Sequence, residues 1–303
     1  MNKKCKTSVG GQAVIEGVMM KNKDLISMSV RLQDGLIDNE CWKDNISDKW
    51  YSKVPLIRGC INFVYMMILG YKCLMKSAQK IEVKNEGEDL KENEKTSKLE
   101  EVLGENIFKV FMALSTVFGF AISIFLFMWF PSFLVKLLSS SFIMSNIFKS
   151  LLEGVIKVII FILYISLTSL MKDMKTVYMY HGAEHKSIAC YEAGKEITVE
   201  NVRKQTRFHS RCGTSFILFV LVVSILVFSV ISWDNVLTRV LTKLIFMPLV
   251  IGISYEIIKF TSSHQNKFTR IFILPGLWLQ RITTREPNDE QIEVAIDALK
   301  HVI

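Results

Sequence analysis

The sequence predicts an α-helical polytopic membrane protein with about four transmembrane helices, a small β-containing N-terminal unit and a C-terminal amphipathic helix. Half of the 303 residues are hydrophobic. Many of them are concentrated in blocks long enough to cross a hydrocarbon core of about 30 Å. An alternating, strand-like pattern occurs near the N-terminus, and a capped helical pattern ends the chain.

Residues 8–56 predict a small β-rich unit. The stretch LISMSVRLQ alternates between apolar and polar residues and ends just before Asp34-Gly35. An Asp-Gly pair supplies the positive φ angles that tight hairpin turns need, so we expect a short β-hairpin here. Glu16, earlier in this unit, is either an exposed strand residue or a polar group that faces a functional site.

Residues 57–78 have apolar residues at helical spacing, interrupted by Arg58, Asn62 and Lys72. Lys and Arg flank the segment on both sides, so a span would place one basic flank outside the cell, against the positive-inside tendency. We therefore predict an interfacial or re-entrant helix. Residues 79–104 are almost all charged or polar, which predicts a flexible linker.

A four-span membrane domain is predicted over residues 107–258. Eight Lys and Arg residues lie in the connection 171–213, against two in 131–150 and two in 233–243. Positive charge favours the cytoplasmic side, so this loop and both termini are predicted to be cytoplasmic, in an inner (cell) membrane. The predicted spans are 107–130 (ended by Pro131), 151–170, 214–232 and 240–258.

Residues 259–303 are expected to form a cytoplasmic tail. Trp278 and two neighbouring arginines suggest an interfacial segment. Asn288 then precedes an acidic first turn and a helical apolar stripe, which together predict an amphipathic helix.

The net charge of +8 invites a nucleic-acid interpretation, because basic proteins are attracted to phosphates. Much of the Lys and Arg lies beside apolar blocks, however, where it sets orientation and contacts anionic lipid. We therefore predict membrane lipid as a partner and disfavour nucleic acid. The six cysteines show no disulfide-framework spacing, so reduced thiols are expected if they face the cytoplasm.

The strongest chemical motif is H-x-x-E-H, formed by His181, Glu184 and His185. On a helix the two histidines share a face and can bind a divalent metal, while the adjacent carboxylate can act as a base toward bound water. The same order of residues occurs in inverted zincins. The alternative is a basic juxtamembrane helix whose histidines meet lipid headgroups or cap carbonyls.

Further possible metal ligands gather at the same predicted membrane face. His209 and Cys212 precede the third apolar block, and Glu256 lies near the end of the fourth. In an open, catalytic site, His181, His185 and one of these three would bind a divalent ion, with zinc the first choice, and leave one position for water.

A closed, structural site is the second interpretation of these ligands, and no metal is the third. In the closed site, the metal would only hold the loop together, through a set of ligands such as His185, Cys190, His209 and Cys212. The pattern of residues leaves all three interpretations open.

Basic residues crowd the same loop, including Arg207 and Arg211. They reflect either the positive-inside tendency or an anionic substrate, such as a phosphorylated or lipid-linked molecule, held by an arginine fork.

With these motifs in view, the chain resembles the YqhQ-like bacterial membrane proteins, a family classed as a domain of unknown function and labelled a predicted metal-dependent enzyme. The resemblance implies that Gln12, Glu16, Arg58 and the segment 283–285 belong to the family pattern and lie close to the 171–213 loop. The stretches that carry it are GGQAVIEGVMM, PLIRG, HGAEHKSIACYE, RKQTRFHSRCGTSF and LQRITTREP.

The function predicted is a metal-dependent hydrolase at the cytoplasmic membrane face. His181 and His185 would be ligands, Glu184 the catalytic base, and His209 or Cys212 the third ligand. The alternative is a non-enzymatic membrane adaptor or assembly factor that binds a cytoplasmic protein. Transport is disfavoured because the predicted spans carry no charges at mid-depth.

Overall fold

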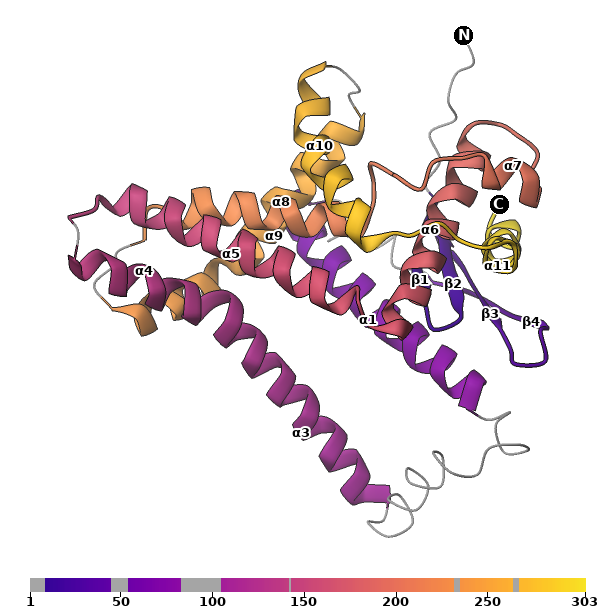
Figure 1. Cartoon of the computed structure of the whole chain (residues 1–303), viewed down its shortest axis with the longest axis horizontal. Coiled ribbons are helices and arrows are strands. Elements are labelled where there is room, and N and C mark those ends of the chain that lie inside the picture. The colour runs from indigo at the N-terminus through magenta and orange to yellow at the C-terminus, as the bar shows by residue number, and fades with distance from the viewer. Residues whose placement is uncertain (1–8, 45–53, 83–104, 142, 232–234, 264–266) are drawn as a thin grey trace. The chain divides into compact units, whose positions relative to one another are not determined.

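The computed structural model describes residues 9–44, 54–82, 105–141, 143–231, 235–263 and 267–303. These residues form a mostly helical chain with an N-terminal four-stranded sheet (Figure 1). The chain divides into two compact units, each assembled from separate segments. The first comprises Met1–Lys80, Tyr164–Val220 and Pro248–Ile303, and the second comprises Ile81–Leu163 and Leu221–Met247.

The N-terminal sheet is an antiparallel meander of β1 (Val9–Val14), β2 (Gly17–Asn22), β3 (Leu25–Arg31) and β4 (Ile37–Lys43). The predicted hairpin at Asp34-Gly35 is confirmed: Gly35 has φ +81°, and Arg31 pairs with Ile37. The β1–β2 turn was harder to recognise. There Glu16 adopts φ +48° without being glycine, so composition gives no turn signal.

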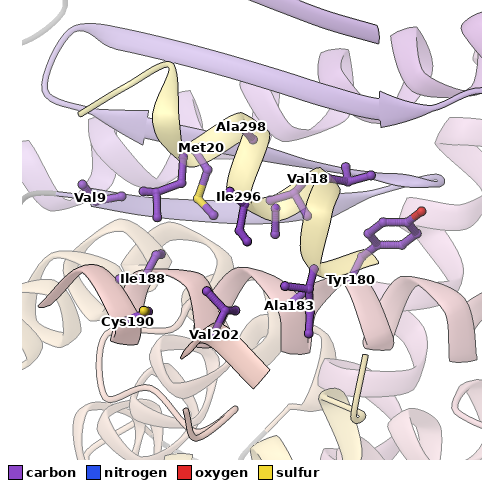
Figure 2. Packing of buried hydrophobic residues seen from close by; sticks show 14 of the residues in the cluster. Val9, Val18, Met20, Tyr180, Ala183, Ile188, Cys190, Val202, Ile296 and Ala298 are labelled. Carbon is purple, nitrogen blue, oxygen red and sulfur yellow. The ribbon is translucent and has the colours of Figure 1, made fainter. Parts of the chain in front are cut away.

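Two helices cover one face of the sheet, α6 (Lys172–Glu192) and α11 (Asp289–Lys300). Val18 and Met20 of the sheet meet Ala183 and Ile188 of α6 in one buried cluster, shown in Figure 2. The C-terminal amphipathic helix is confirmed as well. A capping box joins Asn288 to Gln291, and the predicted stripe is buried: Ile292, Ala295, Ile296 and Leu299.

The other face of the sheet meets α1 (Ile57–Glu82). The backbone N–H of Ile15 donates to Ser77 Oγ over 3.2 Å. The side chain of Gln12 lies against Gly70, where a Cβ would come within 2.2 Å of it. The α1 helix is therefore part of the first unit.

Helix α1 carries the polar residues that interrupt its apolar pattern. In the structure two of them have partners on α9 (Val236–Ser263): Arg58 Nε donates to Glu256 Oε1 over 2.7 Å, and Asn62 Nδ2 donates to Tyr255 Oη over 3.1 Å. Polar groups that are paired with a neighbouring helix cost less in an apolar setting. The assignment of 57–78 to an interface stays a prediction, because α1 is long and apolar enough to cross a bilayer.

Four described helices have the length and hydropathy of membrane spans, as many as predicted. They are not the same four segments that the sequence predicted. Residues 213–228 form α8 (Gly213–Phe228), which is shorter than a typical span, while residues 57–81 qualify. The helix in the third predicted span, 214–232, therefore ends earlier than predicted, and its crossing of a membrane stays a prediction. The four helical segments that qualify are Ile57–Ile81, Leu114–Ser141, Asn146–Thr168 and Val236–Thr261.

The first predicted span does not end at Pro131. Helix α3 (Glu105–Ile124) continues through the π-helical turn η3 (Phe125–Trp129) into α4 (Phe130–Ser141). Within the turn the N–H of Phe130 donates to the carbonyl of Phe125, five residues earlier. Such a widened turn relieves the clash that a proline ring makes with the preceding turn, so the helix passes through it.

The remaining helices are α5 (Asn146–Thr168), α7 (Val199–Arg203) and α10 (Lys267–Thr283). The predicted loop 171–213 thus contains two helices, α6 and α7. Most of the predicted linker, residues 83–104, lies outside the described residues, and residues 79–82 complete α1.

Candidate metal centre

Helix α6 brings three of the predicted site residues to one position. His181, Glu184 and His185 occupy i, i+3 and i+4, which fall on one helical face. Cys212, immediately before α8, meets them: His181 Nε2 lies 3.2 Å from Cys212 Sγ. The ligand atoms of His181, His185 and Cys212 all lie within 4.8 Å of one another. Two segments far apart in sequence therefore converge on one buried point.

Both α6 histidines are held by backbone carbonyls. His181 Nδ1 lies 2.9 Å from the carbonyl oxygen of Thr283, and His185 Nδ1 lies 2.6 Å from that of Arg207. A carbonyl oxygen only accepts hydrogen bonds, so each Nδ1 carries the proton. When such a ring binds a metal, Nε2 is the nitrogen left to supply the lone pair. Metal-binding histidines in proteins are oriented in this way.

Glu184 lies between the two rings. Its Oε2 is 3.8 Å from Nε2 of both His181 and His185, and the side chain is buried. The sheet confines it from behind, since a Cβ on Gly11 would come within 2.9 Å of Glu184 Cγ. The carboxylate is therefore fixed beside the space that the two Nε2 atoms share.

Electrostatics couple His181 and Cys212. Burial by itself lowers the pKa of His181, but the Cys212 thiolate and Glu184 outweigh it and raise that pKa to about 9. Burial by itself raises the pKa of Cys212, whereas His181 and His185 bring it well below the ordinary value for a thiol. Without a metal, the pair is an imidazolium beside a thiolate, and a thiolate is the form that binds metals.

His209 lies just outside this group. Its ring centroid is 5.6 Å from that of His185, and its Nε2 is 3.5 Å from Glu192 Oε2. Burial lowers its pKa. The side chain of Gln280 fixes the backbone here, accepting from His209 N (2.8 Å) and donating to His209 O (2.7 Å). Of the three candidates for third ligand, the geometry places Cys212 with the histidines, His209 just outside them, and Glu256 against Arg58.

Cys190 occupies a different environment. It is fully buried in the apolar cluster beside Val202 (Figure 2), and its Sγ approaches the carbonyl of Glu196 at 3.5 Å. Burial raises its pKa. Because Cys190 comes five residues after His185, its side chain lies on a different face of α6 from the two histidines. The structure does not gather the four ligands of the closed, structural site.

The other candidate residues form ion pairs or hydrogen bonds elsewhere in the first unit. Glu256 binds Arg58, and Glu16 accepts a hydrogen bond from the Tyr180 hydroxyl at 3.1 Å. Arg207 donates to the carbonyl of Thr284, and Arg211 pairs with Glu192. The structure brings none of these four into the His–His–Cys group.

The segment 283–285 packs directly against α6, as the resemblance implied. The N–H of Arg285 donates to the carbonyl of Tyr178 over 2.8 Å, and a Cβ on Gly182 would come within 2.0 Å of the Arg285 carbonyl oxygen. Gln12 and Arg58, also in the family pattern, contact α1 and α9 instead. Residue patterns missed Gln280, Gly11 and Gly182, although a glycine inside a helix signals a close approach.

Fold and site together define a class: a helical protein with four candidate membrane helices, an N-terminal sheet and a buried His–His–Cys cluster. A family model described as "Protein of unknown function (DUF1385)" matches residues 54–303. The chain is also 37% identical over 298 residues to "Uncharacterized protein YqhQ" of Bacillus subtilis (strain 168), covering 97% of this chain and 92% of that protein.

The chain therefore belongs to this YqhQ-like family, as the sequence motifs indicated. No solved structure matches it. The enzyme activity implied by the resemblance stays a prediction.

The contact at Gly182 generates a test of the site. We expect Gly182→Ala to push residues 283–285 off α6 and remove the Thr283 carbonyl from His181. Loss of such an orienting hydrogen bond lowers metal affinity roughly 10–100-fold. The measurement is zinc affinity by chelator competition. Gly10→Ala is the matched control, because a Cβ there meets nothing within 4 Å. Equal affinity in both variants would contradict the proposed geometry.

Proposed function

We propose that this protein is a multi-pass membrane enzyme with a divalent-metal centre, and that the reaction at this centre is hydrolysis. The observation that carries this proposal is the convergence of His181 Nε2, His185 Nε2 and Cys212 Sγ beside the buried Glu184 carboxylate. It supports the open, catalytic interpretation over a structural staple.

The donor set fits zinc. Two imidazole nitrogens and one thiolate are borderline-soft ligands, and a catalytic zinc site keeps three protein ligands and one open position. Tetrahedral zinc holds its ligand atoms roughly 3.3–3.7 Å apart. The His181–Cys212 distance of 3.2 Å is close to this spacing. The carbonyls of Thr283 and Arg207 supply the outer hydrogen bonds.

The residues around this point can then carry out hydrolysis. When bound, a divalent ion supplies a Lewis acid and lowers the pKa of coordinated water toward neutrality. Glu184 accepts the proton of the attacking water and returns it to the leaving group. Because Gly11 and the two rings confine Glu184, its carboxylate is held in place for this step.

The substrate we propose is anionic. Arg207 and Arg211 lie on the loop that leads to Cys212. Their side chains are 22% and 29% exposed to solvent, respectively. They are therefore reachable from solvent while their ion pairs with Glu286 and Glu192 hold them in place. A phosphorylated or lipid-linked group could exchange with these carboxylates.

The membrane part of the proposal rests on the long apolar helices and the excess of Lys and Arg in residues 171–213. It takes α1 as interfacial and α8 as a span, so that two crossings separate the N-terminal sheet from α6 and two more separate α6 from α11. Positive charge near span ends favours the cytoplasmic side. The metal centre, both termini and this segment would then face the cytoplasm of a bacterial inner membrane.

Metal content tests the centre itself. Purified protein is expected to carry about one zinc per chain by elemental analysis, because three donors converge there. His181→Ala and Cys212→Ser should lose it. Cys190→Ser is the matched control and should keep it, since Cys190 lies in the apolar cluster. Wild-type protein without stoichiometric metal, or metal that is lost only in Cys190→Ser, would overturn the proposal.

The role of Glu184 has a separate test. Glu184→Gln is expected to keep the metal but to lower hydrolysis roughly 10²–10⁴-fold, because the amide cannot accept the proton. Zinc-loaded protein would be assayed with chromogenic phosphate, carboxyl ester and peptide substrates. Glu196→Gln, on the connection after α6, is the control. If Glu184→Gln retains full turnover, the carboxylate is not the base.

Sidedness is tested by cysteine labelling. A Lys195→Cys variant, made in a background where Cys41 is replaced, should react with a membrane-impermeant maleimide only after the cells are opened. Lys195 is exposed and lies in the segment assigned to the cytoplasm. Labelling of Lys195→Cys in intact cells would reverse the arrangement.

A further inference from the structure

The second unit contains a buried cluster of charged side chains that the proposed function does not use. Glu153 and Lys157 lie on α5, and Arg239 and Lys243 lie on α9. The exposed fraction of their side chains is 3%, 9%, 1% and 0%, respectively. All four belong to helices with the composition of membrane spans, where charged residues are costly and commonly functional. Lys157 lies midway along α5, so the expectation that the spans carry no charge at mid-length needs correction.

Glu153 is the centre of this cluster. Its Oε1 lies 2.9 Å from Lys157 Nζ and also pairs with Lys243. Its Oε2 lies 3.0 Å from Arg239 Nη2. Lys243 donates as well to the Ser132 hydroxyl of α4 over 2.8 Å. Three helices of the unit thus meet at one carboxylate.

The charges do not balance at this carboxylate. Even with Arg239 set aside, Lys157 and Lys243 share the single negative charge of Glu153. Among the described residues, and with both lysines charged, one positive charge is therefore in excess at a place with little access to water. Buried charges are stable only when they are compensated, so an excess of buried cations favours a bound anion.

We propose that this cluster is a binding site for a phosphate group, provided by a lipid headgroup or by free phosphate. Phosphate offers several oxygens to ammonium donors and carries the charge that the cluster needs. The site is distinct from the metal centre and does not depend on it.

Lys157 is the residue that meets the ligand first. It is the most exposed of the four side chains, and its Nζ lies 5.8 Å from the centroid of the Phe228 ring. Arg239, by contrast, also donates to Ser150 and to the carbonyl of Phe228, so it is held inside the cluster. Lys157 and Lys243 therefore bind the anion, while Arg239 positions Glu153.

The test uses chelated, full-length protein, so that phosphate cannot act through the metal centre. In phosphatidylcholine nanodiscs, the Tm is measured with sodium phosphate and with sodium chloride at matched ionic strength. In a second arm, phosphatidylglycerol nanodiscs replace phosphatidylcholine. A rise of roughly 2–4 °C is expected at tenfold saturation. A response to soluble phosphate identifies a free anion, and a response to phosphatidylglycerol alone identifies a headgroup.

Three variants decide whether the response belongs to this cluster. Lys157→Gln should abolish it, Lys157→Arg should keep it, and Lys136→Gln, at an exposed lysine of α4, should behave as wild type. Without phosphate, Lys157→Gln should be at least as stable as wild type, because it removes the excess charge. A destabilised Lys157→Gln, an unchanged response in that variant, or no response to either phosphate source would overturn the proposal.

Discussion

The candidate centre depends on the close approach of α6 to residues 283–285. Only a glycine at position 182 allows this approach, because a Cβ would come within 2.0 Å of the Arg285 carbonyl oxygen. The approach lets the N–H of Arg285 reach Tyr178 and the carbonyl of Thr283 reach His181. A backbone contact thus sets the tautomer of a side chain, which in turn decides which nitrogen can bind a metal.

The N-terminal sheet has two roles in the same unit. One face buries the apolar side of α6 and α11 (Figure 2), which fixes the helix that carries the motif. On that face Gly11 leaves just enough room for Glu184. The opposite face contacts α1 through Gln12 and Ile15. The sheet therefore connects α1, which qualifies as a span, to the helix with the candidate ligands.

Local signals predicted the parts of this structure that depend on nearby residues. Asp34-Gly35 marked a hairpin and Asn288 a helix start, because turn and cap chemistry act within a few residues. The spacing of His181 and His185 likewise fixed their common face. The sequence also offered Cys212 as a third ligand, but as one choice among His209, Cys212 and Glu256. Choosing among them required the fold of residues 193–212, which no local pattern specifies.

The predictions that needed correction depend on partners distant in sequence or on unusual backbone. Pro131 reads as a helix end, yet a π-helical turn lets the helix continue. Arg58 interrupts the apolar pattern of residues 57–78, and its partner Glu256 is 198 residues away, where no local pattern could find it. The sequence gives the number of charged residues, but it does not show which of them form ion pairs in the folded chain.

The same limit applies to the second unit, where pairing changes what the charges mean. Glu153 and Lys157 are one helical turn apart and would compensate each other if they were alone. Folding adds Lys243 to the same carboxylate, and the balance becomes positive. The metal centre has the opposite character, since Cys212 and Glu184 place negative charge beside two imidazole donors. Because buried charge must be compensated, the cluster around Glu153 favours a bound anion, and the metal centre favours a bound cation.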